Sequence, residues 1–167
     1  MKPFTEVLNK NHVCDDFTCG EELLDNYLKR QASQDVRKKL AACFVLAAKE
    51  SNVIQGYFTL SNNSIPQELI PEDLKKHFPK SYLSIPATLL GRLAVDKNFK
   101  GKGIGELLLL DALKKSYEIS KVIGSFAVVT DPINEKAEKF YLKYGFQKLP
   151  DSGKMFLPMK TISQLFE

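Results

Sequence analysis

The chain has 167 residues, enough for one globular domain and too few for two well-packed ones. Hydrophobic residues make up 44% and charged residues 26%, which argues against collagen-like, disordered and disulfide-stapled proteins. The 24 basic and 20 acidic side chains leave a net charge of +4, which permits an anionic ligand or an RNA partner without requiring either. We therefore expect a single domain over residues 1–167.

Helices and strands are predicted to alternate along the chain. In chain order they are strand 4–8, helix 20–39, strands 41–49 and 53–61, short helix 72–77, strand 88–95, helix 103–120, strand 122–130, helix 132–144, and strands 146–149 and 155–159. Thr18 is expected to cap the first helix, with Glu21 as its capping-box partner. Asp131 fits the N-cap of the helix over 132–144, Pro132 its first position and Gly145 its stop. This alternation predicts a layered α/β or α+β fold on a mixed sheet.

Cysteines and histidines are too few for a metal or disulfide framework. Cys14, Cys19 and Cys43 form no C-x-x-C pair, which indicates free thiols that serve as small packing residues. His12 and His77 are the only histidines, so no metal site is expected. The N-terminus has no apolar segment typical of a signal peptide, and no apolar stretch approaches the ~20 residues of a membrane helix. We expect a cytoplasmic protein with no membrane segment.

The most informative stretch is RLAVDKNFKGKGIG over residues 92–105, which runs from a strand through a glycine-rich turn into a helix. Its three glycines let the backbone approach a ligand closely, and amides at the start of the helix lack internal partners. Together with the helix dipole these amides predict a phosphate site, to which Lys100 and Lys102 add positive charge. The spacing matches neither a Walker A loop nor a dinucleotide fingerprint, whose third glycine is here Glu106. Taken alone, the loop is also compatible with a simple tight turn.

This run resembles the acetyl-CoA loop of the GNAT superfamily of N-acetyltransferases, whose pattern is Gln/Arg-x-x-Gly-x-Gly/Ala after a valine-containing strand. Here the loop reads Lys100-x-x-Gly103-x-Gly105, with lysine in place of glutamine or arginine. The resemblance implies that loop amides hold the CoA pyrophosphate and that the end of the preceding strand offers backbone groups to the pantetheine arm. The cofactor-binding residues so implied are Leu93, Ala94, Val95, Lys100, Gly101, Lys102, Gly103, Ile104, Gly105 and Asn134.

The stretch DPINEKAEKFYLKYGF over residues 131–146 is similar to the later GNAT motif N-x-x-A-x-x-F-Y-x-x-x-G-F. By that resemblance Asn134 lies near the cofactor, and Tyr141 lies beside the thioester sulfur as general acid for the departing thiolate. Phe140 is expected to fill the core. Tyr144 is also expected to be mostly a core residue, and it is the second candidate for the general acid.

The resemblance also implies the GNAT fold. That fold has a central mixed, mostly antiparallel twisted sheet flanked by helices. Here the sheet is expected to splay between the strand ending at Val95 and the strand Val122–Thr130.

Most of the chain carries a narrower resemblance, to toxin-type GNAT proteins. The segments FTCGEELLDNYL (17–28), LLGRLAVD (89–96) and FLPMKTI (156–162) resemble that group, whereas Pro132 departs from its more usual alanine. Members acetylate the amino group of aminoacyl-tRNA and so block translation. They are typically homodimers neutralised by a ribbon-helix-helix antitoxin, and the resemblance implies the same acceptor and partners here.

The chemistry of acetyl transfer is compatible with such an acceptor. An α-amino group, with a pKa of about 7.7–8.0, is roughly a tenth neutral at pH 7, whereas a lysine near 10.4 is neutral only about 0.04% of the time. No general base stands out, which favours an α-amine. Arg92, a charge in an apolar strand, either faces the acceptor or pairs with a carboxylate. Cations available for RNA phosphates include Arg30, Arg37, Lys38, Lys39, Lys75, Lys76 and Lys80.

The sequence therefore predicts an acetyl-CoA-dependent N-acetyltransferase that acts on a primary amine, with the α-amino group of aminoacyl-tRNA as the narrower candidate. Two alternatives stay open: a GNAT enzyme that acetylates a small-molecule or protein amine, and a non-catalytic module that binds acyl-CoA. The presence of Tyr141 at the motif position argues against the non-catalytic module.

Overall fold

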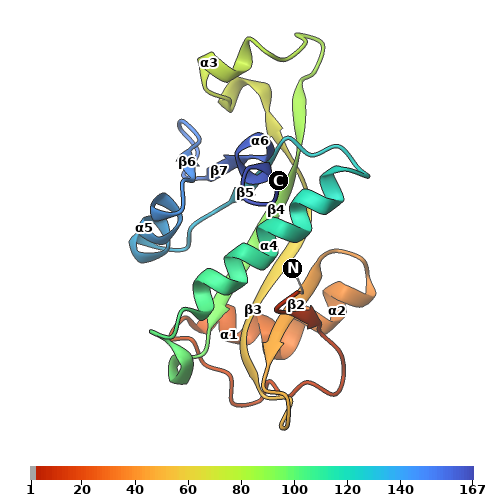
Figure 1. Ribbon diagram of the computed structural model, residues 1–167, viewed down its shortest axis with the longest axis vertical. Coiled ribbons are helices and arrows are strands. Elements are labelled where there is room, and N and C mark those ends of the chain that lie inside the picture. Colours follow the sequence, from red (N-terminus) through yellow and green to blue (C-terminus); the bar gives the residue numbers. More distant parts are fainter. Residues whose placement is uncertain (1–2) are drawn as a thin grey trace. The chain divides into compact units, whose positions relative to one another are not determined.

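The computed structural model describes residues 3–167 and contains a seven-stranded sheet of order β1-β2-β3-β4-β5-β7-β6 (Figure 1). Its strands are Glu6–Val7 (β1), Ala42–Ala47 (β2), Ile54–Pro66 (β3), Ser84–Val95 (β4), Ala127–Thr130 (β5), Gln147–Lys148 (β6) and Met155–Pro158 (β7). Its α-helices are Glu22–Asn26 (α1), Ala32–Arg37 (α2), Glu72–Lys75 (α3), Ile104–Ser120 (α4), Glu135–Lys143 (α5) and Met159–Ser163 (α6). A π-helical stretch spans Tyr27–Gln31 (η1), and 3-10 helices span Gln67–Leu69 (η2) and Lys97–Phe99 (η3). Within the described residues, no helix is long and apolar enough to cross a membrane.

The sheet is mixed and mostly antiparallel, as the sequence predicts. β2 pairs antiparallel with β1 and β3, and β7 pairs antiparallel with β5 and β6. β4 pairs parallel with β5, and their ladder joins residues 88–90 to residues 128–130. That ladder stops at Leu90 and Thr130, although β4 continues to Val95. These are the two strands between which the sequence predicts that the sheet splays.

The chain divides into two compact units. Unit 1 contains the described residues up to Ser61 together with Gly91–Leu113, and unit 2 contains Asn62–Leu90 and Lys114–Glu167. The strands β3 and β4 and the helix α4 each contribute residues to both units, because the boundaries fall inside these elements.

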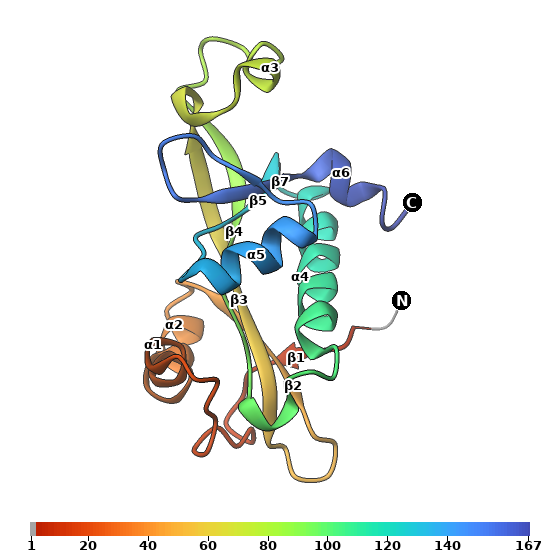
Figure 2. The ribbon, with the colours of Figure 1, turned by 90° about the vertical axis from the view of Figure 1, so that its left-hand side faces the viewer.

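In unit 1 the helical segment 22–37 and the first half of α4 lie on opposite sides of the strands (Figure 2). The side under the helical segment is a core of buried apolar side chains contributed by helix, strands and the N-terminal loop. Its members are Leu8, Phe17, Cys19, Tyr27, Leu28, Ala32, Cys43, Val45, Ile54, Tyr57 and Ala94. The predicted helix over 20–39 is confirmed at 22–37, with one π turn in which the Ala32 N–H donates to the Tyr27 carbonyl.

The predicted cap of that first helix is wrong. Glu21 occupies the N-cap position and makes no side-chain capping bond. The Thr18 N–H instead donates to Asp96 Oδ2 at 3.1 Å, and the Cys19 N–H donates to Asp25 Oδ1 at 2.8 Å. A long-range bond to Asp96 and a local bond to Asp25 have therefore replaced the predicted capping box.

Unit 2 has its own apolar core between β3, β4, β5, β7 and the segments around them. Its members are Ile65, Ile70, Ile85, Ala87, Ala127, Val129, Leu149 and Phe156. The segment 67–83 carries η2 and α3, near the predicted short helix, while β3 and β4 both extend further into the proline-punctuated region than predicted. Gly145, with φ of +93°, follows the end of α5 as expected.

Two predictions about unit 2 are wrong. Asn134 rather than Asp131 caps α5, since the Asn134 side-chain oxygen accepts a hydrogen bond from the Ala137 N–H at 2.9 Å. The strand predicted over 122–130 begins at Ala127. Val122 and Ile123 are 84% and 61% exposed, so these β-branched residues follow α4 as a surface turn and join no ladder.

Candidate active site

The glycine-rich stretch links β4 to α4 within unit 1. Gly101 and Gly103 both have φ of +78°, a conformation that other L residues adopt only with strain. A Cβ built at either position would meet no atom within 4 Å, so both glycines border open space. The predicted turn is present, and its backbone is accessible to a ligand.

The start of α4 supplies the donors that a phosphate needs. The Leu107 N–H donates to the Gly103 carbonyl at 3.2 Å, so the amides of residues 103–105 precede the helix's own hydrogen-bond ladder. They lie at the positive end of a 17-residue helix. This combination of amides and dipole binds phosphate groups in proteins, and the CoA pyrophosphate is chemically suited to it.

Asp96 fixes the loop on its strand side. Its buried carboxylate accepts hydrogen bonds from the Thr18 N–H at 3.1 Å and the Asn98 N–H at 2.8 Å. Its own N–H donates to the Gln55 carbonyl at 2.8 Å, and the Lys97 N–H donates to the Thr18 carbonyl at 2.8 Å. The sequence analysis did not predict this role. An aspartate at the end of a strand commonly begins a turn, because its side chain accepts a hydrogen bond from the backbone N–H two residues later.

Gly56 in β3 allows α4 to lie close to the sheet. A Cβ there would stand 2.8 Å from Leu108 Cδ1, 3.0 Å from the Ala94 carbonyl oxygen and 3.4 Å from Ile104 Cγ2. Ile104 is the first residue of α4, so the absence of a side chain at position 56 lets the start of α4 approach β3 closely. Periodicity could not reveal this, because only the packed structure shows what a Cβ would meet.

The two lysines of the loop are in different situations. Lys100 Nζ donates to the Cys19 carbonyl and so ties the loop to the segment before α1. Lys102 Nζ lies 5.4 Å from the centroid of the Phe99 ring, and its side chain is exposed. Lys102 therefore carries its charge at the surface beside Gly101 and Gly103.

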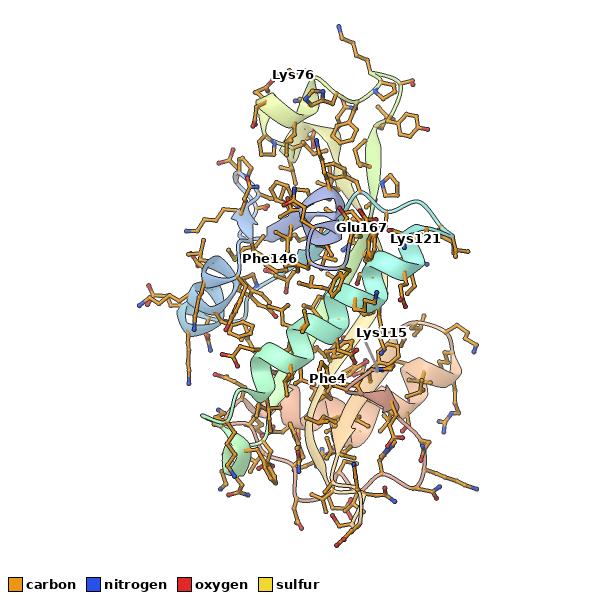
Figure 3. The ribbon with its side chains drawn as sticks, viewed as in Figure 1. Phe4, Lys76, Lys115, Lys121, Phe146 and Glu167 are labelled. Atoms are coloured by element: carbon orange, nitrogen blue, oxygen red, sulfur yellow. The ribbon has the colours of Figure 1, made fainter. Side chains whose placement is uncertain are left out.

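Tyr141 lies on α5 in unit 2 and is 6% exposed. Its ring centroid is 5.3 Å from that of Phe140 and 5.1 Å from that of Phe146, which is labelled in Figure 3. The Thr130 side chain lies beside its hydroxyl, and Thr130 Oγ1 donates to the Leu90 carbonyl at 3.0 Å. Thr130 is a further residue that sequence reasoning missed.

Burial determines the protonation of Tyr141. Desolvation raises the pKa of Tyr141 to about 12, against a smaller lowering effect of the Thr130 side chain. The phenol therefore keeps its proton throughout the neutral range. A phenol in this state can donate a hydrogen bond or a proton and cannot act as a base.

The other motif residues of α5 lie at its two ends. Asn134 is at the N-terminus, where its side-chain oxygen caps the helix. Tyr144 is at the C-terminus, half-buried, with its ring centroid 5.1 Å from that of Phe140 and Lys143 Nζ 5.3 Å from its own ring. Asn134 and Tyr141 belong to unit 2, whereas residues 92–105 belong to unit 1.

Arg92 does not pair with a carboxylate. Its guanidinium carbon lies 3.5 Å from the centroid of the Tyr27 ring, a cation–π contact within unit 1. Within residues 3–167, no acidic side chain is within ion-pair distance of Arg92. Of the two alternatives that the sequence left open, pairing with a carboxylate is therefore wrong.

The three cysteines are free, and Cys19 and Cys43 belong to the core of unit 1. Burial raises the pKa of Cys19 to about 11 and that of Cys43 to about 12, so neither is a thiolate at neutral pH. The prediction that they act as packing residues is confirmed. Among the described residues, no three His, Cys, Asp or Glu side chains are grouped to hold a metal ion.

The glycine loop, the helix end above Gly56 and the mixed sheet together define a class of protein. The chain matches the family described as "Acetyltransferase (GNAT) domain" over residues 40–148. It belongs to the GNAT acetyltransferase family.

Within that family the chain is similar to proteins named as toxins. It is 30% identical over 150 residues to a "tRNA-acetylating toxin" of Mycobacterium tuberculosis, covering 89% of this chain and 87% of that protein. It is also 30% identical over 173 residues to a "Probable toxin TacT" of Sinorhizobium fredii, covering 98% of this chain and 95% of that protein.

Solved structures of KacT and AtaT share the fold over nearly the whole chain. A Tyr-to-Phe mutant of KacT superimposes with a TM-score of 0.92 at 31% identity, covering 97% of this chain and 98% of that one. AtaT complexed with acetyl-methionyl-tRNAfMet gives 0.90 at 29% identity, covering 98% of both chains. A Tyr-to-Phe mutant of AtaT, bound to the C-terminus of the antitoxin AtaR and acetyl-CoA, gives 0.78 at 27% identity, covering 97% of this chain and 96% of that one.

Proposed function

We propose that this protein transfers the acetyl group of acetyl-CoA to the α-amino group of an aminoacyl-tRNA and thereby blocks translation as a toxin. The observation that carries the proposal is the 30% identity, over 89% of the chain, to a protein named a tRNA-acetylating toxin. The likeness to AtaT, solved with an acetylated aminoacyl-tRNA, supports the same class of acceptor.

On the donor side, the amides around Gly101, Gly103, Ile104 and Gly105 hold the pyrophosphate of CoA. Gly101 and Gly103 support this assignment by their positive φ angles and open surroundings, and Ile104 and Gly105 support it by their place at the start of α4. Lys102 adds a surface charge, and Lys100 acts by holding the loop to Cys19.

The backbone of Leu93, Ala94 and Val95 receives the pantetheine arm, and Asn134 lies beside the cofactor. Support for the first assignment comes from the ladder between β4 and β5, which ends before these residues. The amide near Val95 then polarises the thioester carbonyl.

Acetyl transfer needs a neutral amine and a stabilised leaving sulfur. The amine nitrogen bonds to the acetyl carbon, the C–S bond breaks, the nitrogen loses one proton and the sulfur gains one. Tyr141 donates toward the sulfur as its charge develops, and burial keeps that phenol protonated. A thiol has a pKa of about 8.5, so a phenol near 12 acts first as a hydrogen-bond donor. Its proton moves to the sulfur only as the C–S bond opens, and the proton released by the nitrogen restores the phenol through solvent. An α-amine acceptor, partly neutral at pH 7, needs no dedicated base.

On the acceptor side, Arg92 faces the RNA substrate. Exposed cations suited to RNA phosphates are Arg30, Arg37, Lys38 and Lys39 in unit 1, and Lys76 and Lys80 in unit 2, with Lys75 half-buried and 3.6 Å from Glu72. Charge of this kind supports a polyanionic acceptor over a small neutral amine.

The proposal includes the partners and setting of such a toxin. Residues 1–167 form one GNAT domain that works as a homodimer and is neutralised by a ribbon-helix-helix antitoxin. The AtaT structure with the AtaR C-terminus supports an antitoxin partner. We place the protein in the cytoplasm, because aminoacyl-tRNA is made and consumed there.

One assay tests both the aminoacyl-tRNA acceptor and the role of Tyr141 as the general acid. Purified protein, acetyl-CoA and aminoacylated total tRNA are incubated, and N-acetyl-aminoacyl adenosine is measured by mass spectrometry after nuclease digestion. Tyr141→Phe should lower kcat by about 10²–10⁴-fold and leave the acetyl-CoA Kd unchanged. Tyr144→Phe, which removes a hydroxyl from the same helix, is the matched control and should stay near wild type.

The other outcomes identify the alternatives. Acetylation of small-molecule or protein amines, with harmless expression and unmodified tRNA, would favour a general GNAT enzyme. Binding of acetyl-CoA without transfer to any amine in a broad panel would favour a non-catalytic module. Loss of activity in Tyr144→Phe with full activity in Tyr141→Phe would move the acid's role to Tyr144.

A further inference from the structure

The guanidinium of Arg92 rests on a support that is itself fixed. Tyr27, whose ring lies 3.5 Å below the Arg92 guanidinium carbon, is 5% exposed. Its hydroxyl donates to the buried Asp35 Oδ2 at 2.8 Å. The ring also stacks with Tyr57, with centroids 6.4 Å apart and planes 16° from parallel. The ring can therefore neither rotate nor withdraw without breaking one of these contacts.

The backbone beneath Tyr27 is also unusual. Tyr27 begins the π-helical stretch η1, closed by the bond from the Ala32 N–H to the Tyr27 carbonyl. The Tyr57 hydroxyl donates to the Leu24 carbonyl at 2.7 Å and holds the turn just before it. Single π turns inside α-helices are rare and often occur at functional sites. Here the π turn places Tyr27 under the arginine.

The Arg92 guanidinium lacks a protein acceptor. Within residues 3–167, it makes no hydrogen bond and no ion pair. The Asp35 carboxylate accepts a hydrogen bond from the Tyr27 hydroxyl instead. Every fully buried side-chain nitrogen or oxygen in this part of the chain does have a partner, so the guanidinium nitrogens reach the surface. A half-buried, permanently charged fork without a counter-ion is suited to an anion supplied from outside.

The charge along the same helical segment indicates which kind of anion binds Arg92. The residues from 29 to 39 include five exposed cations and one acid, Asp35, which is buried. The five cations are Lys29, Arg30, Arg37, Lys38 and Lys39. In the described chain none of them has an acidic side chain within ion-pair distance. A single carboxylate would need only Arg92, whereas a row of unpaired cations matches the repeated charges of a nucleic-acid backbone.

We propose that Arg92, stacked on Tyr27, binds a backbone phosphate near the aminoacylated end of the RNA, with Tyr27 and Asp35 as positioning residues. The inference rests on the proposed RNA acceptor and adds the contact that sets the RNA end in place. Arg92 precedes Val95 by three residues on β4, about 10 Å of extended chain. That span is comparable with the separation between the amine of an esterified amino acid and the phosphate of its own nucleotide.

Binding is tested without catalysis. The Kd of a fluorescent RNA hairpin ending in a single-stranded 3′ extension is measured by anisotropy over a salt series. Arg92→Gln should weaken binding about tenfold and reduce the slope of log Kd against log salt by about 0.7–0.9, the loss of one phosphate contact. Arg92→Lys should keep the slope and lose part of the affinity, because it keeps the charge without the fork. Lys49→Gln, an exposed cation in the β2–β3 turn, is the control.

The positioning role has its own variant. Tyr27→Phe keeps the ring and loses the bond to Asp35, so it should weaken RNA binding about threefold at an unchanged acetyl-CoA Kd. A wild-type RNA Kd in Tyr27→Phe would remove Tyr27 and Asp35 from the proposal. A wild-type Kd and salt slope in Arg92→Gln would overturn the phosphate site itself.

Acceptor kinetics separate this proposal from the proposed function. Arg92→Gln should raise KM for aminoacyl-tRNA by a much larger factor than KM for an amino acid ethyl ester, which has no phosphate. An equal loss with both acceptors would place Arg92 at the amino acid and refute the phosphate contact. If wild type acetylates no aminoacyl-tRNA, the proposed function fails, while the anisotropy series still decides whether Arg92 holds a phosphate.

Discussion

Replacing Gly56 by alanine tests whether close packing of α4 on the sheet sets the donor site. The added Cβ would lie 2.8 Å from Leu108 Cδ1, about 0.6 Å inside the 3.4 Å at which ordinary contact begins. The Leu108 side chain is fully buried, and the second close atom, the Ala94 carbonyl oxygen at 3.0 Å, is backbone. Rotation of the Leu108 side chain cannot relieve the contact with Ala94, so the backbone of β3 or β4 has to shift as well, and the start of α4 that packs on it is displaced.

Such overpacking costs about 1–3 kcal/mol of the free energy of unfolding. A displaced helix end also misaligns the amides proposed for the pyrophosphate, so we expect the acetyl-CoA Kd to rise about tenfold, equivalent to about 1.4 kcal/mol. Urea unfolding followed by far-UV circular dichroism gives the stability, and calorimetry gives the Kd.

Gly124→Ala is the matched control, because no atom lies within 4 Å of its Cβ position and its φ is not positive. It should be neutral or slightly stabilising. The reasoning would be refuted if Gly56→Ala matched Gly124→Ala in both urea midpoint and Kd. The double variant Gly56→Ala/Leu108→Ala should cost less than the sum of its parts, since the new methyl then occupies space that Leu108 vacates.

Three further outcomes follow from buried groups. Asp96→Asn should lower the free energy of unfolding by about 1.5–3 kcal/mol and weaken acetyl-CoA binding, measured by urea and calorimetry, whereas exposed Asp151→Asn should do neither. Cys19 and Cys43 should resist a thiol reagent at pH 8, since burial raises their pKa to about 11 and 12, and should react in guanidinium; fast native labelling at Cys43 would contradict this. The pKa of Tyr141, near 12, lies above the value of about 10 in the unfolded chain, so the unfolded chain releases this proton at lower pH. The stability that this group contributes is therefore complete below pH 10. It declines toward pH 12 by up to about 1.4 kcal/mol per pH unit. In Tyr141→Phe, the urea midpoint should therefore fall less steeply between pH 9 and 11 than in wild type. An equal dependence of the midpoint on pH in both proteins would show that Tyr141 titrates normally.

The sequence predicts the features that local chemistry determines. The turn at Gly101 and Gly103 follows from glycine spacing after a strand, and the end of α5 follows from Gly145 at positive φ. The mixed sheet follows from hairpins at both ends of an alternating pattern, and the pairing confirms it.

Features decided by residues far apart in the chain escape such reasoning. The Thr18 N–H bonds to Asp96, 78 positions later, so a capping box that fits the local sequence does not form. The apolar pair Val122 and Ile123 has strand-like composition and no strand to pair with. Likewise, the need for glycine at position 56 depends on where α4 comes to lie.

The boundaries inside β3, β4 and α4 affect how the protein is made. The first 61 residues lack part of their own core until β4 and the first turns of α4 have left the ribosome. At about 5–20 residues per second, synthesis from Asn62 to Leu113 takes several seconds, during which the nascent hairpin β2–β3 lacks its covering helix. Each unit is made of two separate stretches of the chain, so no single protease cut releases either unit as one continuous fragment.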